Sequence, residues 1–346
     1  MIESLVEILV KIAVVLGGLL GTVAYMILAE RKVSAFIQHR YGPNRVGPWG
    51  LLQPIADGLK FMFKEDIIPP HVNKVVYVMA PAIILAPALM TLAVVPFGDT
   101  IPLFGRNIRL QIADLNIGIL YILALTSLGV YGIVLGGWAS NNKYSLLGGL
   151  RASSQMISYE LALGLSIVGV LMITGSLRLN EVVAGQQHML WGILPRWNVF
   201  TQPLGCLLFV VAAFAETNRA PFDLPECEQE LVAGYHSEYS SMKFAMFFMA
   251  EYANMVTSSA VIVTLFFGGW HLPWLIPEGA TSLGYSLLKV AAFAAKTGFF
   301  LFLYLWVRWT LPRFRYDQLM RLGWKVFLPL ALANVVVTGA ILAFRG

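Results

Sequence analysis

The sequence predicts an all-α polytopic membrane protein with about eight transmembrane helices and one amphipathic helix at the membrane interface. Two observations predict this class. Of the 346 residues, 58% are hydrophobic and only 12% are charged, whereas soluble domains carry about 25% charged residues. The apolar residues also gather in runs of roughly 17–25 residues, the length needed to cross a hydrocarbon core of about 30 Å.

Eight apolar runs have this length, and we expect them to form a single transmembrane helical domain over residues 1–346. They lie near residues 5–29, 75–95, 117–138, 157–174, 199–215, 244–267, 287–306 and 326–344. No small-residue cleavage pattern follows the first run, so we expect a retained helix rather than a signal peptide. The sequence shows no internal repeat of the kind found in many secondary transporters.

The amphipathic helix is predicted over residues 51–64, in the long loop after the first run. At helical spacing, four apolar and three charged side chains fall on opposite faces: Leu52, Ile55, Leu59 and Met62 against Asp57, Lys60 and Lys64. Such a helix commonly lies in the plane of the membrane interface. It is either a simple anchor or the floor of an access route for an amphiphile whose tail stays in the lipid.

The distribution of Lys and Arg predicts the orientation in the membrane. Loops 30–74, 139–156, 216–243 and 308–325 together hold sixteen of these residues, whereas the opposite loops and the C-terminal end hold five. The positive-inside rule therefore places the first set in the cytoplasm and both termini on the periplasmic side. The net charge of +5 is explained by this topology rather than by nucleic-acid binding.

The segment 216–241 concentrates acids where the chain leaves the membrane. Six carboxylates accompany the single base Arg219: Glu216, Asp223, Glu226, Glu228, Glu230 and Glu238. Carboxylates this close cannot all ionise independently, so their titrations are expected to couple and some to pass protons near neutral pH. A solvated acidic loop is the alternative. Pro221 and Pro225 favour a fixed arrangement, because proline restricts the backbone.

Two further carboxylates, Glu160 and Glu251, lie inside apolar runs. An intramembrane carboxylate commonly marks an ion path or a buried ion pair. Lys296 is also deep within a run, and the sequence leaves its role open. The histidines and the two cysteines have no metal or haem spacing, and no nucleotide-binding glycine loop is present. Any redox cofactor is therefore expected on a partner or as a diffusing molecule.

Four segments carry a resemblance that covers nearly the whole chain. AETNRAPFDLPECEQELVAGYHSEYSSMKFAMFFMAEY is similar to the hallmark segment of the H-type membrane subunit of NADH-quinone oxidoreductase, which lies at the heel of respiratory complex I. ERKVSAFIQHRYGPNRVGPWGLLQPIADGLKFMFKED resembles the first cytoplasmic loop of that family. GWASNNKYSLLGGLRASSQMISYELALGL and RFRYDQLMRLGWKVFLPLAL resemble it as well.

The resemblance implies a subunit of a proton-translocating enzyme of the bacterial inner membrane, not catalytic alone. Such a subunit carries no redox centre, since FMN and the iron–sulfur clusters belong to partner subunits. Together with the soluble quinone-reducing subunits on the cytoplasmic side, it forms the chamber that quinone enters from the bilayer. Small membrane subunits are expected beside it.

The resemblance also assigns residues to this chamber and to a chain of carboxylates leading away from it. The matches to the chamber wall are Glu30, Arg31, Arg40, Asp57, Lys60 and Phe222. The matches to the chain are Glu160, Glu216, Asp223, Glu226, Glu228, Glu230 and Glu251, with Arg219 holding that cluster together.

Three other functions are compatible with the residues alone. Glu160 and Glu251 could be the proton carriers of a self-sufficient secondary transporter. The chain could be a purely structural anchor for a soluble redox module. It could also be the related membrane subunit of a hydrogenase-type complex, which the subunits that co-purify would distinguish.

Overall fold

The computed structural model describes residues 2–103, 106–190, 194–225, 232–273, 275–277 and 282–345. Within these ranges, seven helical segments are long and apolar enough to cross a membrane: residues 5–37, 74–94, 118–139, 143–174, 241–266, 283–310 and 316–344. The prediction of an all-α polytopic membrane protein is therefore confirmed.

The long helices are α1 (Ile2–Ile37), α3 (Lys74–Met90), α4 (Gly118–Ala139), α5 (Lys143–Thr174), α10 (Ser241–Phe266), α11 (Leu283–Thr310) and α13 (Leu328–Arg345). The shorter helices are α2 (Gln53–Phe63), α6 (Leu179–Gly185), α7 (Asn198–Thr201), α8 (Pro203–Glu216) and α12 (Tyr316–Arg321). Single 3₁₀ turns lie at Pro48–Gly50, Thr91–Val94 and Gly234–His236, and a π-helical turn at Leu322–Phe327 joins α12 to α13.

Two short antiparallel hairpins were not predicted from the sequence. Strand β1 (Thr100–Leu103) pairs with β2 (Arg106–Arg109), with Thr100 opposite Arg109. Strand β3 (Met189–Leu190) pairs with β4 (Leu194–Pro195). Both lie between apolar helices, where strands this short give only a weak sequence pattern.

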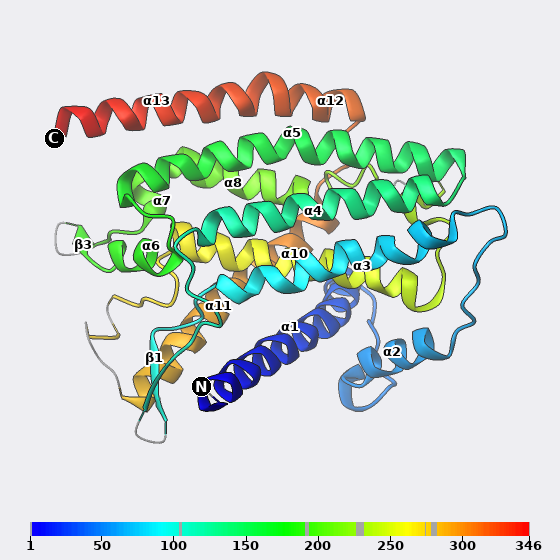
Figure 1. Cartoon of the computed structure of the whole chain (residues 1–346), viewed down its shortest axis with the longest axis horizontal. Coiled ribbons are helices and arrows are strands. Elements are labelled where there is room, and N and C mark those ends of the chain that lie inside the picture. Colours follow the sequence, from blue (N-terminus) through cyan, green and yellow to red (C-terminus); the bar gives the residue numbers. More distant parts are fainter. Residues whose placement is uncertain are drawn as a thin grey trace.

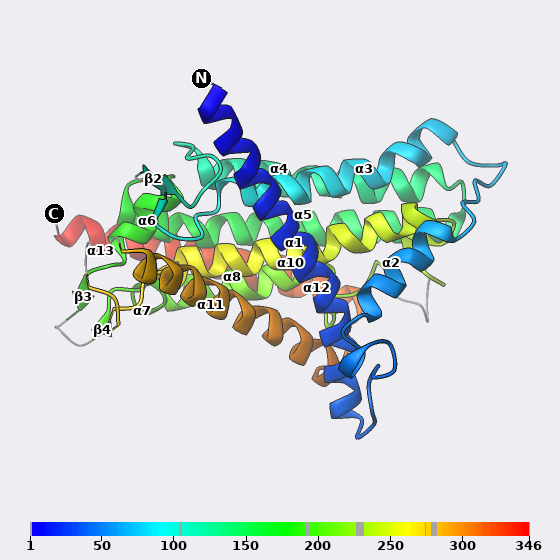
Figure 2. The same ribbon diagram turned by 90° about the horizontal axis from the view of Figure 1, so that it is seen from below.

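Helices α3, α4, α5, α10 and α13 run side by side, and α1 and α11 cross them obliquely (Figures 1 and 2). Helix α2 lies at one end of the bundle, whereas α6 and both hairpins lie at the other (Figure 1). The two groups of loops that the basic residues distinguish are thus at opposite ends. The predicted amphipathic helix is present as α2, with Ile55, Leu59 and Met62 exposed.

The fifth predicted span, residues 199–215, is shorter than expected. It is divided between α7 and α8, and α8 has 14 residues, a length of about 21 Å at 1.5 Å per residue. Pro203 begins α8, and the break before it is stabilised by buried Gln202, which donates to Thr338 Oγ1 over 2.8 Å and accepts from Asn334. Within the described residues, seven long apolar helices and the shorter α8 thus correspond to the eight expected spans.

Two other helix boundaries also differ from the prediction. Helix α1 continues to Ile37 rather than ending near residue 29, and α5 begins at Lys143 rather than near residue 157. Both extensions are polar, so a hydropathy pattern does not include them. The α5 extension is nonetheless packed, because Ser145 and Gln155 are fully buried.

Helix α10 is the most buried of the seven long segments, with 72% of its most apolar stretch of 18 residues inside the protein. The turn that follows α10 contacts Lys296 of α11, which donates to the carbonyl oxygens of Phe267, Gly269 and His271 over 2.8, 3.0 and 2.8 Å. These bonds use all three donors of the ammonium group and place a cation at the negative end of the helix dipole. Lys296, whose role the sequence left open, therefore caps the central helix.

Candidate functional site

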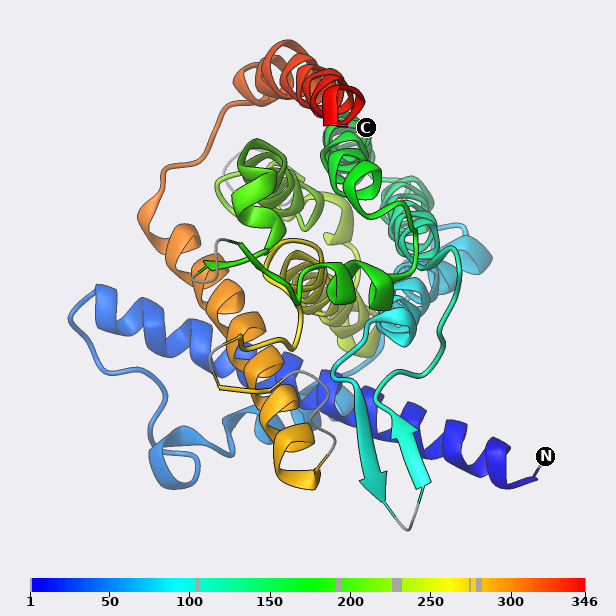
Figure 3. The ribbon, with the colours of Figure 1, turned by 90° about the vertical axis from the view of Figure 1, so that its left-hand side faces the viewer.

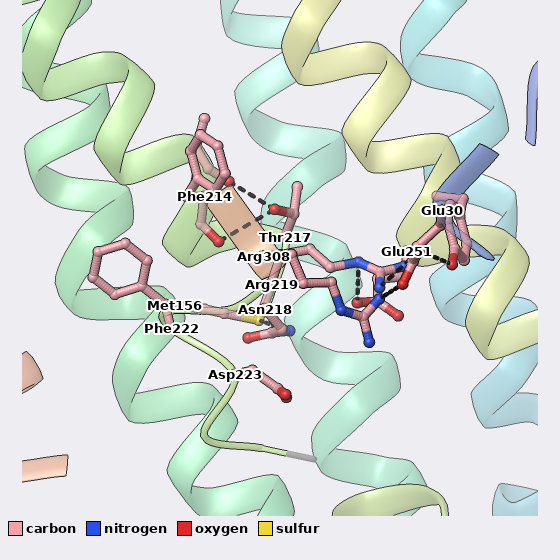
Figure 4. Close-up of polar contacts among 12 residues, drawn as sticks. Glu30, Met156, Phe214, Thr217, Asn218, Arg219, Phe222, Asp223, Glu251 and Arg308 are labelled. Atoms are coloured by element: carbon pink, nitrogen blue, oxygen red, sulfur yellow. Dashed lines mark hydrogen bonds and ion pairs between the residues drawn. The ribbon is translucent and has the colours of Figure 1, made fainter. Parts of the chain in front are cut away.

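The candidate site is a cluster of buried charges between α1, α10, α11 and the loop after α8. Arg219 of that loop is 3% exposed and lies with its Nε 2.9 Å from Oε1 of Glu251 on α10. Its Nη1 is 3.7 Å from Oε2 of Glu30, which is near the end of α1 that the loop charges place in the cytoplasm. One guanidinium thus joins two carboxylates that are 221 residues apart in the sequence (Figure 4).

Arg308 of α11 completes the cluster, since its Nη1 is paired with Oε1 of Glu30. Tyr252, next to Glu251, donates its hydroxyl to Oε2 of Glu30 over 2.5 Å, and the Arg219 guanidinium lies 4.3 Å from the centre of its ring. The sequence pattern placed Arg308 in a loop and did not predict this role. The sequence feature that could have indicated this role is the position of Arg308 just after an apolar run.

Charge balance explains how these groups tolerate burial. Glu30 and Glu251 are each 7% exposed, and the two guanidinium groups supply two opposite charges. A buried ion pair gains little net stability, because desolvation offsets the Coulomb attraction, but removing one partner leaves an uncompensated buried charge and costs about 3–5 kcal/mol. The cluster therefore depends on all four charged groups. A change of charge at one of them changes the electrostatic interactions of the other three.

The loop after α8 positions Arg219. Gln155 of α5, fully buried, donates from Nε2 to the carbonyl oxygens of Ala215 and Phe222 over 2.8 and 2.7 Å, and to Asn218 Oδ1 over 3.2 Å. Asn218 has a φ of 52°, the left-handed conformation that ends helices and that Asn tolerates better than most residues. The chain therefore turns away from the α8 axis immediately before Arg219.

This turn separates Arg219 from the α8 face that carries Glu216. The two residues are three apart and would share a helical face if the helix continued that far. Helix α8 ends at Glu216 instead, and Arg219 is directed to Glu251 and Glu30. Arg219 thus joins Glu251 of the predicted carboxylate chain to Glu30 of the predicted chamber wall.

Phe222 and Asp223 extend the site toward the end of α11. Phe222 is 3% exposed, and its ring stacks on Phe314 with centroids 5.4 Å apart. Asp223 Oδ2 is 2.7 Å from Arg313 Nη2. Burial raises the pKa of the Asp223 carboxyl above its ordinary value, and the positive charges of Arg313, Arg308 and Arg219 oppose that rise.

Glu216 and Glu160 form a second acidic pair. Glu216 lines an internal cavity of about 30 Å³, together with Thr126, Asn254 and Ser258. Apolar side chains form most of the cavity surface, and the carboxyl group of Glu216 lies at its wall. Glu160 of α5 is half-buried and lies close enough to Glu216 for their charges to interact.

The predicted chamber-wall residues are only partly brought together. Arg31 Nη1 lies 2.8 Å from Oδ2 of Asp57 on α2, so this pair links the end of α1 to α2. Arg40 and Lys60 are exposed and lie outside the buried cluster. The predicted carboxylates Glu226, Glu228 and Glu230 lie outside the residues that the structure describes.

An all-α bundle of long apolar helices with balanced charges buried inside it defines a class of protein: a multi-pass membrane protein with a buried ionic cluster. The family model described as NADH dehydrogenase matches residues 10–339. The chain is 52% identical over 339 residues to the first of the H-type NADH-quinone oxidoreductase subunits of Cytophaga hutchinsonii, covering 98% of this chain and 97% of that protein.

Two further relatives agree with this assignment. The second H-type NADH-quinone oxidoreductase subunit of Geobacter metallireducens is 55% identical, with 98% of this chain and 96% of that protein covered. The NADH-quinone oxidoreductase subunit 8 of Rhodothermus marinus is 54% identical, with 93% of each chain covered. The chain therefore belongs to the family of H-type membrane subunits of NADH-quinone oxidoreductase, a multi-subunit oxidoreductase of respiratory electron transport.

Proposed function

We propose that this chain forms part of the quinone chamber and couples quinone reduction to proton translocation. The soluble quinone-reducing subunits would supply the electrons from FMN and iron–sulfur clusters and would cover the α2 end of the bundle, while small membrane subunits pack laterally. The observation that carries the proposal is the buried cluster of Glu30, Arg219, Glu251 and Arg308. This cluster connects the surface near α2 with the core of the bundle.

The first step of the proposed coupling is a change of charge at the quinone headgroup near α2. Reduction of a quinone to a quinol takes up two electrons and two protons. The Arg31–Asp57 pair at the end of α1 is suited to hold the polar headgroup while α2 borders the lipid tail. Arg31 directly follows Glu30 in the sequence, so a change of charge at the headgroup would act on buried Glu30 over a short distance.

The second step transmits this change inward. Glu30 shares Arg219 with Glu251, so protonation of Glu30 releases the guanidinium to pair more closely with Glu251. Each unit of pKa change in such a coupled group is equivalent to about 1.4 kcal/mol. Glu216 and Glu160, which lie close enough for their charges to interact, would be the next carboxylates of this path.

The proposed orientation gives the first prediction. In a background without its two natural cysteines, a cysteine at exposed Arg315 is expected to react only with a reagent added to the cytoplasmic side. A cysteine at exposed Arg196 is expected to react only from the periplasmic side. Impermeant maleimide labelling of right-side-out and inverted vesicles measures both. Reaction of the two positions from the same side would contradict the proposed topology.

Arg31→Ala gives the second prediction. Loss of the guanidinium leaves Asp57 without its partner, and we expect a roughly threefold to tenfold higher KM for a short-tailed quinone, the effect of losing about 1 kcal/mol from an exposed ionic contact. NADH-driven quinone reduction, normalised to assembled complex, measures it.

The control reaction is electron transfer from NADH to a water-soluble acceptor, which bypasses this chain. Lys64→Ala is the matched variant, because Lys64 is also an exposed base of this region but is neither a predicted chamber-wall residue nor part of the Arg31–Asp57 pair. An equal fall of both reactions in Arg31→Ala would identify an assembly defect and remove Arg31 from the chamber wall.

A further inference from the structure

A groove of about 1210 Å³ lies beside the first half of α1, and no member of the charge cluster lines it. The first half of α1, the β1–β2 hairpin and α11 surround it, and they lie on one side of the molecule (Figure 3). Val256 and Ala260 of α10 form its floor. The proposed function uses none of these residues.

The walls of the groove are apolar along most of its length. Three valines of α1, spaced by four residues, line it and are more than half exposed: Val6 at 53%, Val10 at 57% and Val14 at 68%. The opposite wall is formed by Phe293, Ala294 and Leu301 of α11. Because α1 and α11 are both long enough to cross the membrane, these walls lie within the hydrocarbon region and face acyl chains.

The rim near the hairpin is basic. Among the described charged residues that line the groove, three are cations, Lys11, Arg106 and Arg109, and one is an anion, Glu7. Lys11 is paired with Glu7 at 2.6 Å, and Arg109 with Asp114 at 3.3 Å while its side chain is 69% exposed. An excess of positive charge at the membrane surface above an apolar groove is the arrangement that attracts acidic headgroups.

We propose that this groove binds an anionic phospholipid, with its acyl chains along α1 and α11 and its phosphate at the hairpin arginines. The volume exceeds the roughly 300–1,000 Å³ of pockets for small soluble ligands, and the walls match hydrocarbon chains. The phosphate complements Arg106 and Arg109, since guanidinium groups bind phosphate through paired hydrogen bonds. The bound lipid fills the space between the oblique helix α1 and the bundle.

The first arm of the test fills the groove. Gly18 and Gly21 of α1 both have open space where a Cβ would lie, but only Gly18 lines the groove. The assembled complex is purified in detergent, incubated with mixed micelles of phosphatidylglycerol and phosphatidylethanolamine, and washed. Retained lipid is then measured by mass spectrometry. Gly18→Phe is expected to lose about one phosphatidylglycerol per complex, whereas Gly21→Phe retains it.

The second arm removes the headgroup site. Arg106→Gln with Arg109→Gln is expected to weaken phosphatidylglycerol binding about thirtyfold, at about tenfold per 1.4 kcal/mol and about 1 kcal/mol for each basic residue. Arg196→Gln is the matched control, because Arg196 is exposed on the same end of the bundle but does not line the groove.

Three results would overturn the proposal. They are equal phosphatidylglycerol retention by Gly18→Phe and Gly21→Phe, equal weakening by the hairpin and Arg196 variants, and loss of a partner membrane subunit from the Gly18→Phe complex. The last would identify a protein helix as the occupant. Quinone reduction is measured in parallel, so failure of the lipid site is distinguishable from failure of the proposed coupling function.

Discussion

Arg219→Ala is expected to reduce the amount of assembled complex to a small fraction of the wild-type level. The substitution leaves Glu251 without its closest cation and Glu30 with Arg308 alone. An uncompensated buried charge costs about 3–5 kcal/mol, which is comparable with a large part of the stability of a typical domain. Native gel electrophoresis of membranes, with immunodetection of this chain, measures the assembled fraction.

The control for Arg219→Ala is the same substitution at Arg178, whose pair with Glu181 is exposed and is expected to contribute about 1 kcal/mol or less. A second variant, Arg219→Gln with Glu251→Gln, removes one positive and one negative charge and is expected to recover part of the assembly. Wild-type assembly of Arg219→Ala, or no recovery in the double variant, would contradict a charge-balanced cluster.

Glu216→Gln is expected to lower quinone-linked turnover and the associated proton pumping about tenfold or more, with the complex still assembled. Glutamine keeps the size and much of the hydrogen bonding of glutamate but cannot carry a proton, and positioned proton transfer typically contributes 10²–10⁴-fold to a rate. NADH-driven quinone reduction and proton uptake in membrane vesicles, normalised to assembled complex, measure both effects.

Glu238→Gln provides the matched control for Glu216→Gln. Glu238 belongs to the same acidic segment, but its Oε1 accepts a hydrogen bond from Asn142 over 2.8 Å, which glutamine can also accept. We therefore expect near wild-type turnover. Wild-type rates and proton stoichiometry in Glu216→Gln would instead favour a purely structural anchor, the alternative in which neutralising these acids has no effect on coupling.

Hydropathy determined most of the helical fold, because a segment that crosses a bilayer must bury its backbone polar groups in its own hydrogen bonds. Length and composition therefore predicted the positions of all seven long helices of the described residues, together with an eighth span at α7 and α8, and helical periodicity predicted α2. The hydropathy pattern was less informative at the polar ends of helices, and it omitted the first part of α5. It also joined α7 and α8 into one span. It could not show the break at Pro203, because a tertiary contact of Gln202 stabilises that break.

The sequence by itself also determined which residues carry charge inside the membrane, and so identified Glu160, Glu216 and Glu251 as unusual. Only the tertiary structure decided their partners. Glu30 and Arg308 are 278 residues apart and meet because α1 and α11 cross. Arg219 faces Glu251 because Gln155 holds the turn after α8. Local sequence sets where a charge costs free energy, but only the packing of distant helices determines which opposite charge offsets that cost.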